Sequence, residues 1–481
     1  MGEATYTGMK KLLLAFSLLF SLFVSAQEVV AVEDQLVTSN IILSVVVGQP
    51  IEYSVHNYAV SYTTTDAFGQ PDTATGLVCV PEVDGLVFPL AVYNHGTVNN
   101  RDEVLSVVGV QERFVAQAIS GSGFITLAPD YLGLGGNDGI HPYFHAATEA
   151  SAGRDMIIAV RAWLDENESP RSDQVFVTGY SQGGHASMAL HRLLEETDEG
   201  PSVTAAAHLS GSYIVRPPSV QGLASSNPNP NTLRFFLNQV IAYEYVYNLY
   251  GGVDSLFKVP YRAPVQSYVE EAIDLQQLGE EIVALIQDNN AVVGDIFIDQ
   301  YVTDVLDMDP ELVNAYTENT VLDWAPEQPT LLYACPGDEI VNPVNAQIAF
   351  DTMTARGSES VTLTFGPEAS HLDCVPFAAL AAVEFFLERA DVFPVSTGTP
   401  VDRPEVRMSP NPVGAGEQLA VYGVEGQRPF VIYDQSGRLL TRGETSANGR
   451  IGIPASLPRG VVVIRLGLGD GTFVVRRVMV R

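Results

Sequence analysis

A serine at position 181 stands between two glycines in the segment VFVTGYSQGGHA (175–186), which contains the pattern G-x-S-x-G. Apolar β-forming residues precede the serine, and a helical pattern follows it. In this pattern a strand turns sharply into a helix, so that the serine hydroxyl is exposed at the end of the strand. Glycine is needed at 179 and 183 because a Cβ there would collide across the turn. The segment predicts a nucleophilic serine of the kind used in acyl transfer.

A nucleophilic serine needs a base to take its proton and an acid to orient that base. On α/β sheets with this turn the three residues follow in the order Ser, Asp or Glu, His. Only one of the eight histidines lies beyond residue 208, and it is His371 in GPEASHLDC. Between Ser181 and His371, the strand-like segment TLLYACPGD ends with Asp338, and Glu339 beside it is the alternative acid. We therefore predict a triad of Ser181, Asp338 and His371.

Acyl transfer also places a negative charge on the substrate oxygen, which needs N–H donors. We expect one donor to be the backbone N–H of Gln182, which follows the nucleophile and opens a helix. The second should come from a loop after an earlier strand, and the segment from Tyr93 to Thr97 (YNHGT) is the candidate.

Two histidines near these segments, His95 and His185, are of a type that binds metals. No further ligands accompany them at the spacing of a metal site. We therefore expect structural roles for both, and we predict neither a metal nor an organic cofactor.

The chain has three cysteines, and two of them flank the predicted acid and base. Cys335 lies three residues before Asp338, and Cys374 lies three residues after His371. A triad would bring the two loops together, so we expect a disulfide between Cys335 and Cys374. Cys79, in the apolar run GLVCV, is expected to be a buried strand residue with a free thiol. One disulfide and one free thiol are compatible with an exported chain.

Strand-like and helical segments alternate along most of the chain. Helical patterns at 151–166 and 375–390 separate the later strands, and this alternation predicts a mostly parallel sheet with helices on both faces. In such sheets the site lies beyond the carboxyl ends of the strands, which is where Ser181 falls. The expected strands are 51–62, 73–80, 87–96, 123–130, 175–180, 202–211, 330–338 and 361–367.

The alternation is interrupted between residues 217 and 328, where the pattern is largely helical and rich in aromatic residues. We predict a cap or lid inserted into a catalytic domain of residues 27–392. The aromatic residues of LRFFLNQVIAYEYVYNLY are expected to form mainly the core of the cap, and the alternative is a substrate groove.

The two ends of the chain differ in character from this body. Residues 1–26 combine the basic start Met9-Lys10-Lys11, the apolar run LLLAFSLLFSLFV and the small residues Val24-Ser25-Ala26, which predicts a signal peptide. Residues 393–405 are rich in Pro, Thr and Val and predict a linker. Residues 406–481 contain short strands separated by turns, which predicts a small all-β domain.

The formal net charge is −32, and the acidic residues are concentrated between residues 27 and 401. An acidic body would be repelled by phosphates, so nucleic acid is not an expected partner. No run after residue 26 is long and apolar enough for a membrane span, so we expect no transmembrane segment in the mature chain.

Several of these segments together resemble a known family. GYSQGGHA, APDYLGLGG (128–136), HPY (141–143), GDEIV and SHLDC are similar to segments of the secretory lipases of the α/β-hydrolase superfamily, the group that includes fungal lipase A, and of its bacterial relatives. The resemblance covers about residues 55–390. It implies an α/β-hydrolase fold and matches Ser181, Asp338 and His371 to the family's triad, whereas the sequence departs from the family in the predicted cap. It also implies that Asp130, in PDYLG, contributes to the oxyanion hole beside Gln182.

The tail resembles the C-terminal sorting domain of the type IX secretion system, a sandwich-like all-β domain. The similar segments are SPNPV, VIYDQSGRLL, IPASLPRGVVVIRL and the final VVRRVMV. The resemblance implies that the type IX machinery is a partner and that the chain crosses the inner and outer membranes. The mature protein would then be secreted or attached to the cell surface.

The sequence therefore predicts a secreted serine hydrolase that cleaves a carboxylic ester or lipid substrate, an esterase or a lipase. Two alternatives stay open. One is a serine exopeptidase on the same fold, and the other is a surface-displayed binding protein that has lost activity.

Overall fold

The computed structural model describes residues 27–394 except Glu168, and residues 406–481 except Glu425, 434–438, Pro458 and 468–472. The predicted signal peptide and most of the predicted linker lie outside the described residues. The chain divides into two compact units, Met1–Val392 and Phe393–Arg481. Among the described residues, no helix combines the length and the apolar character needed to cross a membrane.

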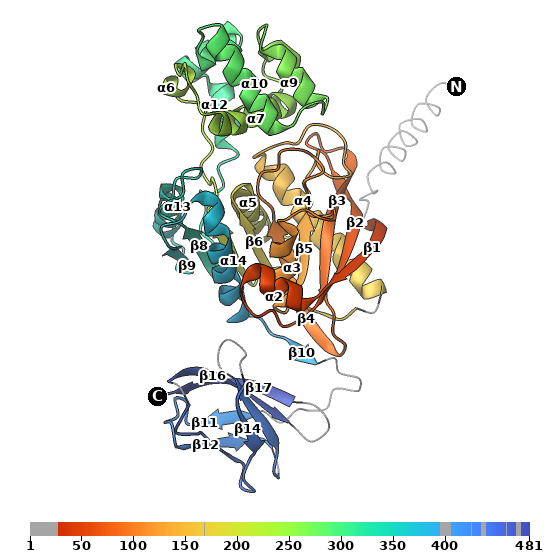
Figure 1. Cartoon of the computed structure of the whole chain (residues 1–481), viewed down its shortest axis with the longest axis vertical. Helices are drawn as coiled ribbons and strands as arrows, with labels where there is room; N and C mark the ends of the chain where they lie inside the picture. Colours follow the sequence, from red (N-terminus) through yellow and green to blue (C-terminus); the bar gives the residue numbers. More distant parts are fainter. Residues whose placement is uncertain are drawn as a thin grey trace, which may run out of the picture. The chain divides into compact units, whose positions relative to one another are not determined.

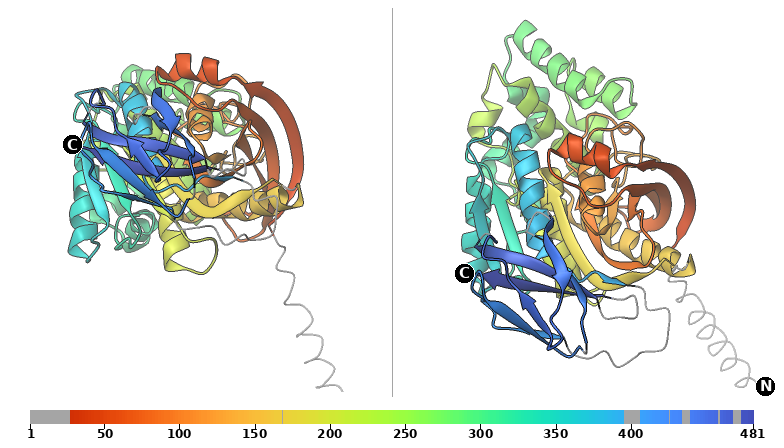
Figure 2. Two further views of the ribbon diagram at one scale, coloured as in Figure 1. Left: turned by 90° about the horizontal axis from the view of Figure 1, so that it is seen from below. Right: turned by 60° about the horizontal axis from the view of Figure 1, so that its bottom comes forward.

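The first unit is built on one mixed sheet (Figure 1). Its strands run in the order β1-β2-β3-β5-β4-β6-β7-β8-β9, antiparallel from β1 to β5 and parallel from β5 to β9. Figure 2 shows the strong curvature of the first strands, as the twist of such sheets requires. The bounds are β1 Val29–Thr38, β2 Val55–Thr65, β3 Pro71–Pro81, β4 Leu86–Asn94, β5 Ile125–Pro129, β6 Arg171–Tyr180, β7 Ala205–Leu209, β8 Thr330–Ala334 and β9 Val361–Phe365.

Helices cover both faces of this sheet because successive strand residues point to opposite sides. In β6, Phe176 packs into one core with Phe386, whereas Val175 and Val177 pack into another with Ile157. The first face is covered by α2 (Asn40–Val47), α3 (Arg113–Gly121) and α14 (His371–Leu387), and the second by α4 (Ala146–Glu166), α5 (Gln182–Glu196) and α13 (Val344–Ala355). The predicted layers are thus present.

Between β7 and β8 the chain forms a group of helices, drawn in green in Figure 1, with a hydrophobic core of its own. Tyr243 is buried in that core, and Phe235 and Phe236 pack against it. The aromatic run therefore belongs mainly to the core of this helical group, as expected. The helices are α6 Val220–Leu223, α7 Pro230–Tyr247, α8 Val253–Leu256, α9 Arg262–Val269, α10 Leu275–Asp288, the 3-10 helix η1 Val293–Ile296, α11 Asp299–Asp307 and α12 Pro310–Thr317.

The second unit is all β, with two antiparallel sheets in the orders β11-β12-β15 and β14-β13-β16-β17. Alternate residues such as Leu419, Ile432 and Ile464 share one core, as in a small sandwich. The bounds are β11 Arg407–Ser409, β12 Gln418–Tyr422, β13 Pro429–Tyr433, β14 Leu439–Glu444, β15 Arg450–Gly452, β16 Gly460–Gly467 and β17 Phe473–Val480. The two-residue strand β10, Phe393–Pro394, belongs to neither of these two sheets.

Two helices differ from the sequence prediction: one was not predicted, and the other begins earlier than predicted. Helix α2 was not predicted, although Ser39 caps its start and Gly48 ends it with φ 72°. Helix α14 begins at His371, four residues before the predicted start at 375, because the Ser370 hydroxyl accepts the N–H of Asp373 and caps the first turn. His371 is therefore the first residue of a helix and is not part of a loop.

A buried pair of histidines connects α5 to the sheet. His208 on β7 and His191 on α5 are both fully buried, with His191 Nδ1 lying 3.3 Å from His208 Nε2. The other ring nitrogen of His208 lies 2.8 Å from the hydroxyl of Ser187. Burial, with a smaller contribution from His191, lowers the pKa of His208 well below its ordinary value.

We expect the free energy of unfolding to decrease between pH 7 and pH 5. Below about pH 6.5, the ordinary pKa of histidine, the unfolded chain binds a proton that buried His208 does not bind. The stability contributed by the neutral ring is therefore present above that pH and is lost as the pH falls, at about 1.4 kcal/mol per pH unit for each such group. Urea denaturation at several pH values measures the slope. His208→Gln should reduce it, and an unchanged slope would contradict the assignment.

Candidate active site

The turn between β6 and α5 presents Ser181. The serine has φ 59° and ψ −117°, a strained conformation for a residue with a side chain, and α5 starts directly after it. A Cβ at Gly179 would lie 2.2 Å from the carbonyl oxygen of Gly183, and one at Gly183 would lie 1.9 Å from the carbonyl oxygen of Asn94. Both glycines of the pattern are thus required by close backbone contact.

The structure brings Ser181, Asp338 and His371 together from the ends of three parallel strands. His371 Nδ1 lies 2.7 Å from Asp338 Oδ2, and His371 Nε2 lies 2.9 Å from Ser181 Oγ. An ionised carboxylate only accepts, so Nδ1 carries the proton and Nε2 has a lone pair directed at the hydroxyl. The other oxygen of Asp338 accepts the N–H groups of Ile340 and Val341. The arrangement can move a proton from Ser181 to His371.

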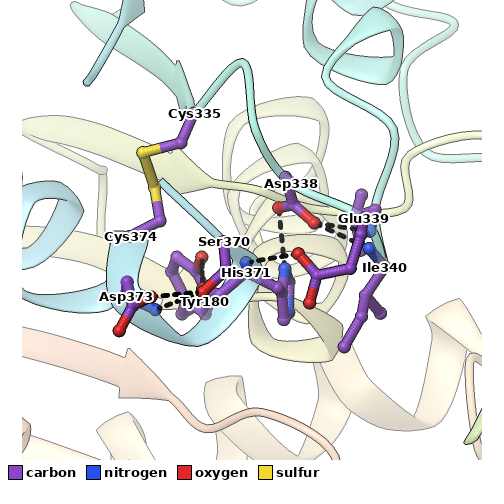
Figure 3. Close-up of a disulfide and its surroundings, with 10 residues drawn as sticks. Tyr180, Cys335, Asp338, Glu339, Ile340, Ser370, His371, Asp373 and Cys374 are labelled. Atoms are coloured by element: carbon purple, nitrogen blue, oxygen red, sulfur yellow. Dashed lines mark hydrogen bonds and ion pairs between the residues drawn. A yellow bond between two sulfur atoms is a disulfide. The ribbon is translucent and has the colours of Figure 1, made fainter. Parts of the chain in front are cut away.

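The backbone of His371 is held on both sides (Figure 3). Its N–H donates to Glu339 Oε2 at 3.0 Å, and its carbonyl accepts the hydroxyl of Tyr180 at 2.6 Å. Glu339, the alternative acid in the sequence, therefore binds the peptide group of His371 while Asp338 binds its ring. Burial raises the pKa of Tyr180, so the phenol remains a donor. The sequence did not reveal this role of Tyr180, although the residue precedes Ser181 in the motif.

Cys335 and Cys374 form a disulfide with a Cα–Cα distance of 6.0 Å. Figure 3 shows it joining the segment after β8 to the first turn of α14, next to Asp338 and His371. Cys79 is free and buried, and burial raises the pKa of its thiol to about 12. The thiol of Cys79 is therefore protonated at neutral pH.

Of the three residues predicted for the oxyanion hole, Gln182 and Thr97 line one cavity and Asp130 does not. The first N–H groups of a helix have no carbonyl acceptor within it, and Gln182 is the first residue of α5. Thr97 lies in the loop after β4, and its hydroxyl is 2.8 Å from that of Tyr143. Gln182 and Thr97 both line the same cavity.

Asp130 lies beneath that loop and is completely buried. Its carboxylate accepts the hydroxyl of Thr75 at 2.8 Å and the N–H of Ser106 at 3.1 Å, while its own N–H donates to the carbonyl of Thr75. Burial raises its pKa, and these hydrogen bonds oppose the shift. In this conformation the Asp130 carboxylate connects Thr75 on β3 to the segment at Ser106. Its backbone N–H already donates to Thr75, so this N–H is not available to an oxyanion.

A second carboxylate, which the sequence did not single out, also supports the loop. Glu112 Oε1 accepts the N–H of Gly96 at 2.8 Å and the hydroxyl of Tyr93 at 2.9 Å. Glu112 lies 16 residues after Gly96, and neither helix nor strand spacing relates the two positions, so the sequence did not reveal this contact.

The two histidines considered as metal ligands contact protein groups. The ring nitrogens of His95 face the carbonyl oxygens of Gly96 and Asp130, and those of His185 face Glu149 and Asn319. Within the described residues, no group of three or more His, Cys, Asp or Glu side chains is arranged to hold a metal ion.

A cavity of about 520 Å³ lies between the sheet and the helices inserted after β7. Thr97, His141 and Gln182 line it from the sheet side, and Asn238 and Tyr268 line it from the inserted helices. The lining is mixed, with apolar side chains such as Leu134 and Ile273 beside the polar ones, and it includes both Thr97 and Gln182. Ser181 is not among the residues that line the cavity, but Gln182, which follows it in the chain, is.

Comparison with solved structures identifies the fold. The chain is similar to the rice cell wall degrading esterase LipA from Xanthomonas oryzae, with a TM-score of 0.63 and 25% identity over 75% of this chain and 97% of LipA. It is also similar to Candida antarctica lipase A in its closed state, with a TM-score of 0.53 and 15% identity over 75% and 81% of the two chains. No family model matches the chain, and no curated protein matches it. The first unit has the α/β-hydrolase fold, as predicted.

We expect Gly183→Ala to lower the free energy of unfolding by about 3 kcal/mol or more. The added Cβ would collide with the carbonyl oxygen of Asn94, a backbone atom that cannot move without its strand. Gly96→Ala is the matched control, since the added Cβ there would meet its nearest atom at 3.6 Å, an ordinary contact. Thermal unfolding of the two variants measures the difference. Equal melting temperatures would refute the close-approach argument.

Replacing both cysteines of the disulfide by serine should destabilise the fold by about 4 kcal/mol, the loop-entropy value for a closed loop of this size. The bond spans a sequence separation of 39 residues and holds the acid segment against the base helix. Denaturant titration measures the loss, and Cys79→Ser is the control for a cysteine outside the disulfide. A double variant as stable as the control would contradict this expectation.

Proposed function

We propose that the protein is a serine hydrolase that cleaves carboxylic esters, an esterase or lipase, through Ser181, Asp338 and His371. The observation that carries the proposal is the continuous chain of hydrogen bonds from Asp338 through His371 to Ser181, at 2.7 and 2.9 Å. The tautomer that Asp338 imposes leaves His371 Nε2 free to accept a proton from the Ser181 hydroxyl.

In the first half of the reaction, Ser181 Oγ attacks the ester carbonyl and His371 Nε2 takes its proton. The carbonyl oxygen becomes negative and is stabilised by the N–H of Gln182 and by a donor from the Thr97 loop. His371 then gives its proton to the departing alcohol, and an acyl-enzyme remains on Ser181.

In the second half, a water molecule attacks the acyl group as His371 takes its proton. The proton returns to Ser181 and the carboxylic acid leaves. The imidazolium that forms in each half is stabilised by Asp338, which remains ionised. Asp130 and Glu112 act as supports of the oxyanion loop in this mechanism.

The ester class is supported by the two similar structures, one described as an esterase and the other as a lipase. A peptidase that recognises a free amino terminus would need an unpaired carboxylate near the cavity. Three carboxylates line the cavity: Glu271 pairs with Arg101 at 2.7 Å, Asp274 accepts the N–H of Gln277 to cap α10, and exposed Asp102 makes no ion pair within the described residues. The preference for an ester over a peptide therefore rests on the similar structures, and the anilide panel below tests the peptide.

We propose in addition that the protein is exported. Residues 1–26 would act as the signal peptide and residues 406–481 as the type IX sorting domain, so that the mature enzyme is secreted or displayed on the cell surface. The two-sheet fold of the second unit, with its own core, is compatible with an independent sorting domain.

The test is hydrolysis of p-nitrophenyl esters from acetate to palmitate by the purified chain, beside Ser181→Ala and His371→Ala. Each substitution should lower kcat by about 10⁴-fold or more, since the triad acts as a unit. The chain-length optimum then separates an esterase from a lipase, and a fluorophosphonate should label the wild type but not Ser181→Ala.

An aminoacyl-anilide panel measured in parallel tests the alternative substrate. Anilide turnover with little ester turnover would establish a peptidase instead. A wild-type chain that turns over neither esters nor anilides and does not react with the fluorophosphonate would favour the binding-protein alternative, and the proposed function would be wrong.

A further inference from the structure

The side chain of Gln182 is held by a group of polar residues, three of them buried and His141 partly buried, that the proposed reaction does not use. This group, the Gln182 cluster, consists of His141, Glu149, His185 and Asn319. Glu149 lies on α4, His185 on α5 and Asn319 in the segment after α12, so three distant parts of the chain meet at the first turn of α5. Glu149 and Asn319 are each 1% exposed, and His185 is fully buried.

His141 accepts a hydrogen bond from Gln182. Its Nδ1 lies 2.8 Å from the carbonyl oxygen of Leu132, which can only accept, so Nδ1 carries the proton. Its Nε2 therefore has a lone pair, and it lies 2.8 Å from Gln182 Nε2. Burial lowers the pKa of His141 to about 4, so the ring stays neutral at physiological pH.

Glu149 accepts the second amide proton of Gln182, at 2.9 Å from its Oε1. Both N–H groups of the Gln182 amide thus have acceptors, and only one orientation of the amide satisfies them. The reversed orientation would direct the amide oxygen at a carboxylate and at the lone pair of His141. The end of the Gln182 side chain is therefore fixed by two hydrogen bonds from different segments.

His185 forms a close pair with Glu149 and shares a proton with it. His185 Nε2 lies 2.7 Å from the carbonyl oxygen of Asn319 and must donate to it. Its Nδ1 lies 2.6 Å from Glu149 Oε2, so one proton bridges these two atoms. Whichever atom holds that proton, the pair as a whole is neutral, and it does not repel a developing negative charge.

We propose that Glu149 is a positioning residue, which acts through the Gln182 side chain to fix the backbone N–H of Gln182 that receives the oxyanion. The inference rests on the proposed function of the site. An oxyanion donor works when it lies about 2.7 to 3.1 Å from the position of the oxyanion, and small rotations of its peptide group weaken it. Gln182 follows the strained Ser181, and the anchoring of its side chain limits that rotation.

The experiment measures kcat, KM and thermal unfolding of the full chain for Glu149→Ala, Glu149→Gln, Gln182→Ala and the double alanine variant. Glu149→Ala should lower kcat by about 10- to 100-fold with KM changed less than about threefold, because one oxyanion donor is weakened but not lost. Gln182→Ala keeps the backbone N–H but lacks the anchored side chain, so it should lose about as much.

The double variant should lose no more than either single variant, because both remove the same anchor. Glu149→Gln should retain kcat within about threefold, since its amide can accept from Gln182 and donate to neutral His185. His141→Ala removes the other anchor and should also lower kcat, which keeps the test decisive if Glu149→Ala does not fold.

Asp155→Ala is the matched control. Asp155 is a fully buried carboxylate on the same helix, and it accepts hydrogen bonds from Thr64 and Arg154. This variant should lower the melting temperature but leave kcat within about threefold of the wild type.

Additive losses in the double variant, or a wild-type kcat in Glu149→Ala or His141→Ala, would overturn the positioning role. The failure of the proposed function looks different. In that case the wild type itself has no ester turnover and its Ser181 is not labelled, and the positioning role is then excluded as well.

Discussion

The close approach of three backbone segments at the end of β6 is the constraint on which the site depends. Gly179, Gly183 and the carbonyl of Asn94 lie so near one another that no Cβ fits between them, and Ser181 takes a positive φ to complete the turn. This turn directs the hydroxyl toward His371 and starts α5 at the next residue. The nucleophile and the expected oxyanion donor are thus fixed by one local geometry.

The acid and the base are positioned by covalent and polar contacts to the same strand ends. The disulfide joins the segment after β8 to α14, Glu339 accepts the N–H of His371, and Tyr180 donates to its carbonyl. Because Tyr180 is the residue before Ser181, the strand that presents the nucleophile also holds the backbone of the base. A displacement of any one of these segments therefore changes the Ser181–His371 distance.

Much of this arrangement could be predicted from sequence because it depends on order and local pattern. The alternation of strand-like and helical segments predicts the sheet, and the G-x-S-x-G turn and the position of His371 after all other histidines predict the residues that meet at its edge. The supporting contacts could not be predicted, since Glu112, Glu149 and Tyr180 act through distances set by tertiary packing. Helix α2 has cap residues at both ends but is short, and its exposed apolar residues give it little helical periodicity.

The inserted helices are attached to the loop that carries Thr97. The carbonyl of Asn99 accepts the N–H of Leu275, its side chain accepts from Arg234, and Arg101 pairs with Glu271. The same helices are followed by Asn319, whose carbonyl oxygen accepts the N–H of His185 in the Gln182 cluster. Both sides of the expected oxyanion hole are therefore connected to this helical group. Because interiors are close-packed, a change in the packing of these helices reaches Thr97 and Gln182 together. The inserted helices thus contribute to the geometry of the site as well as covering its cavity.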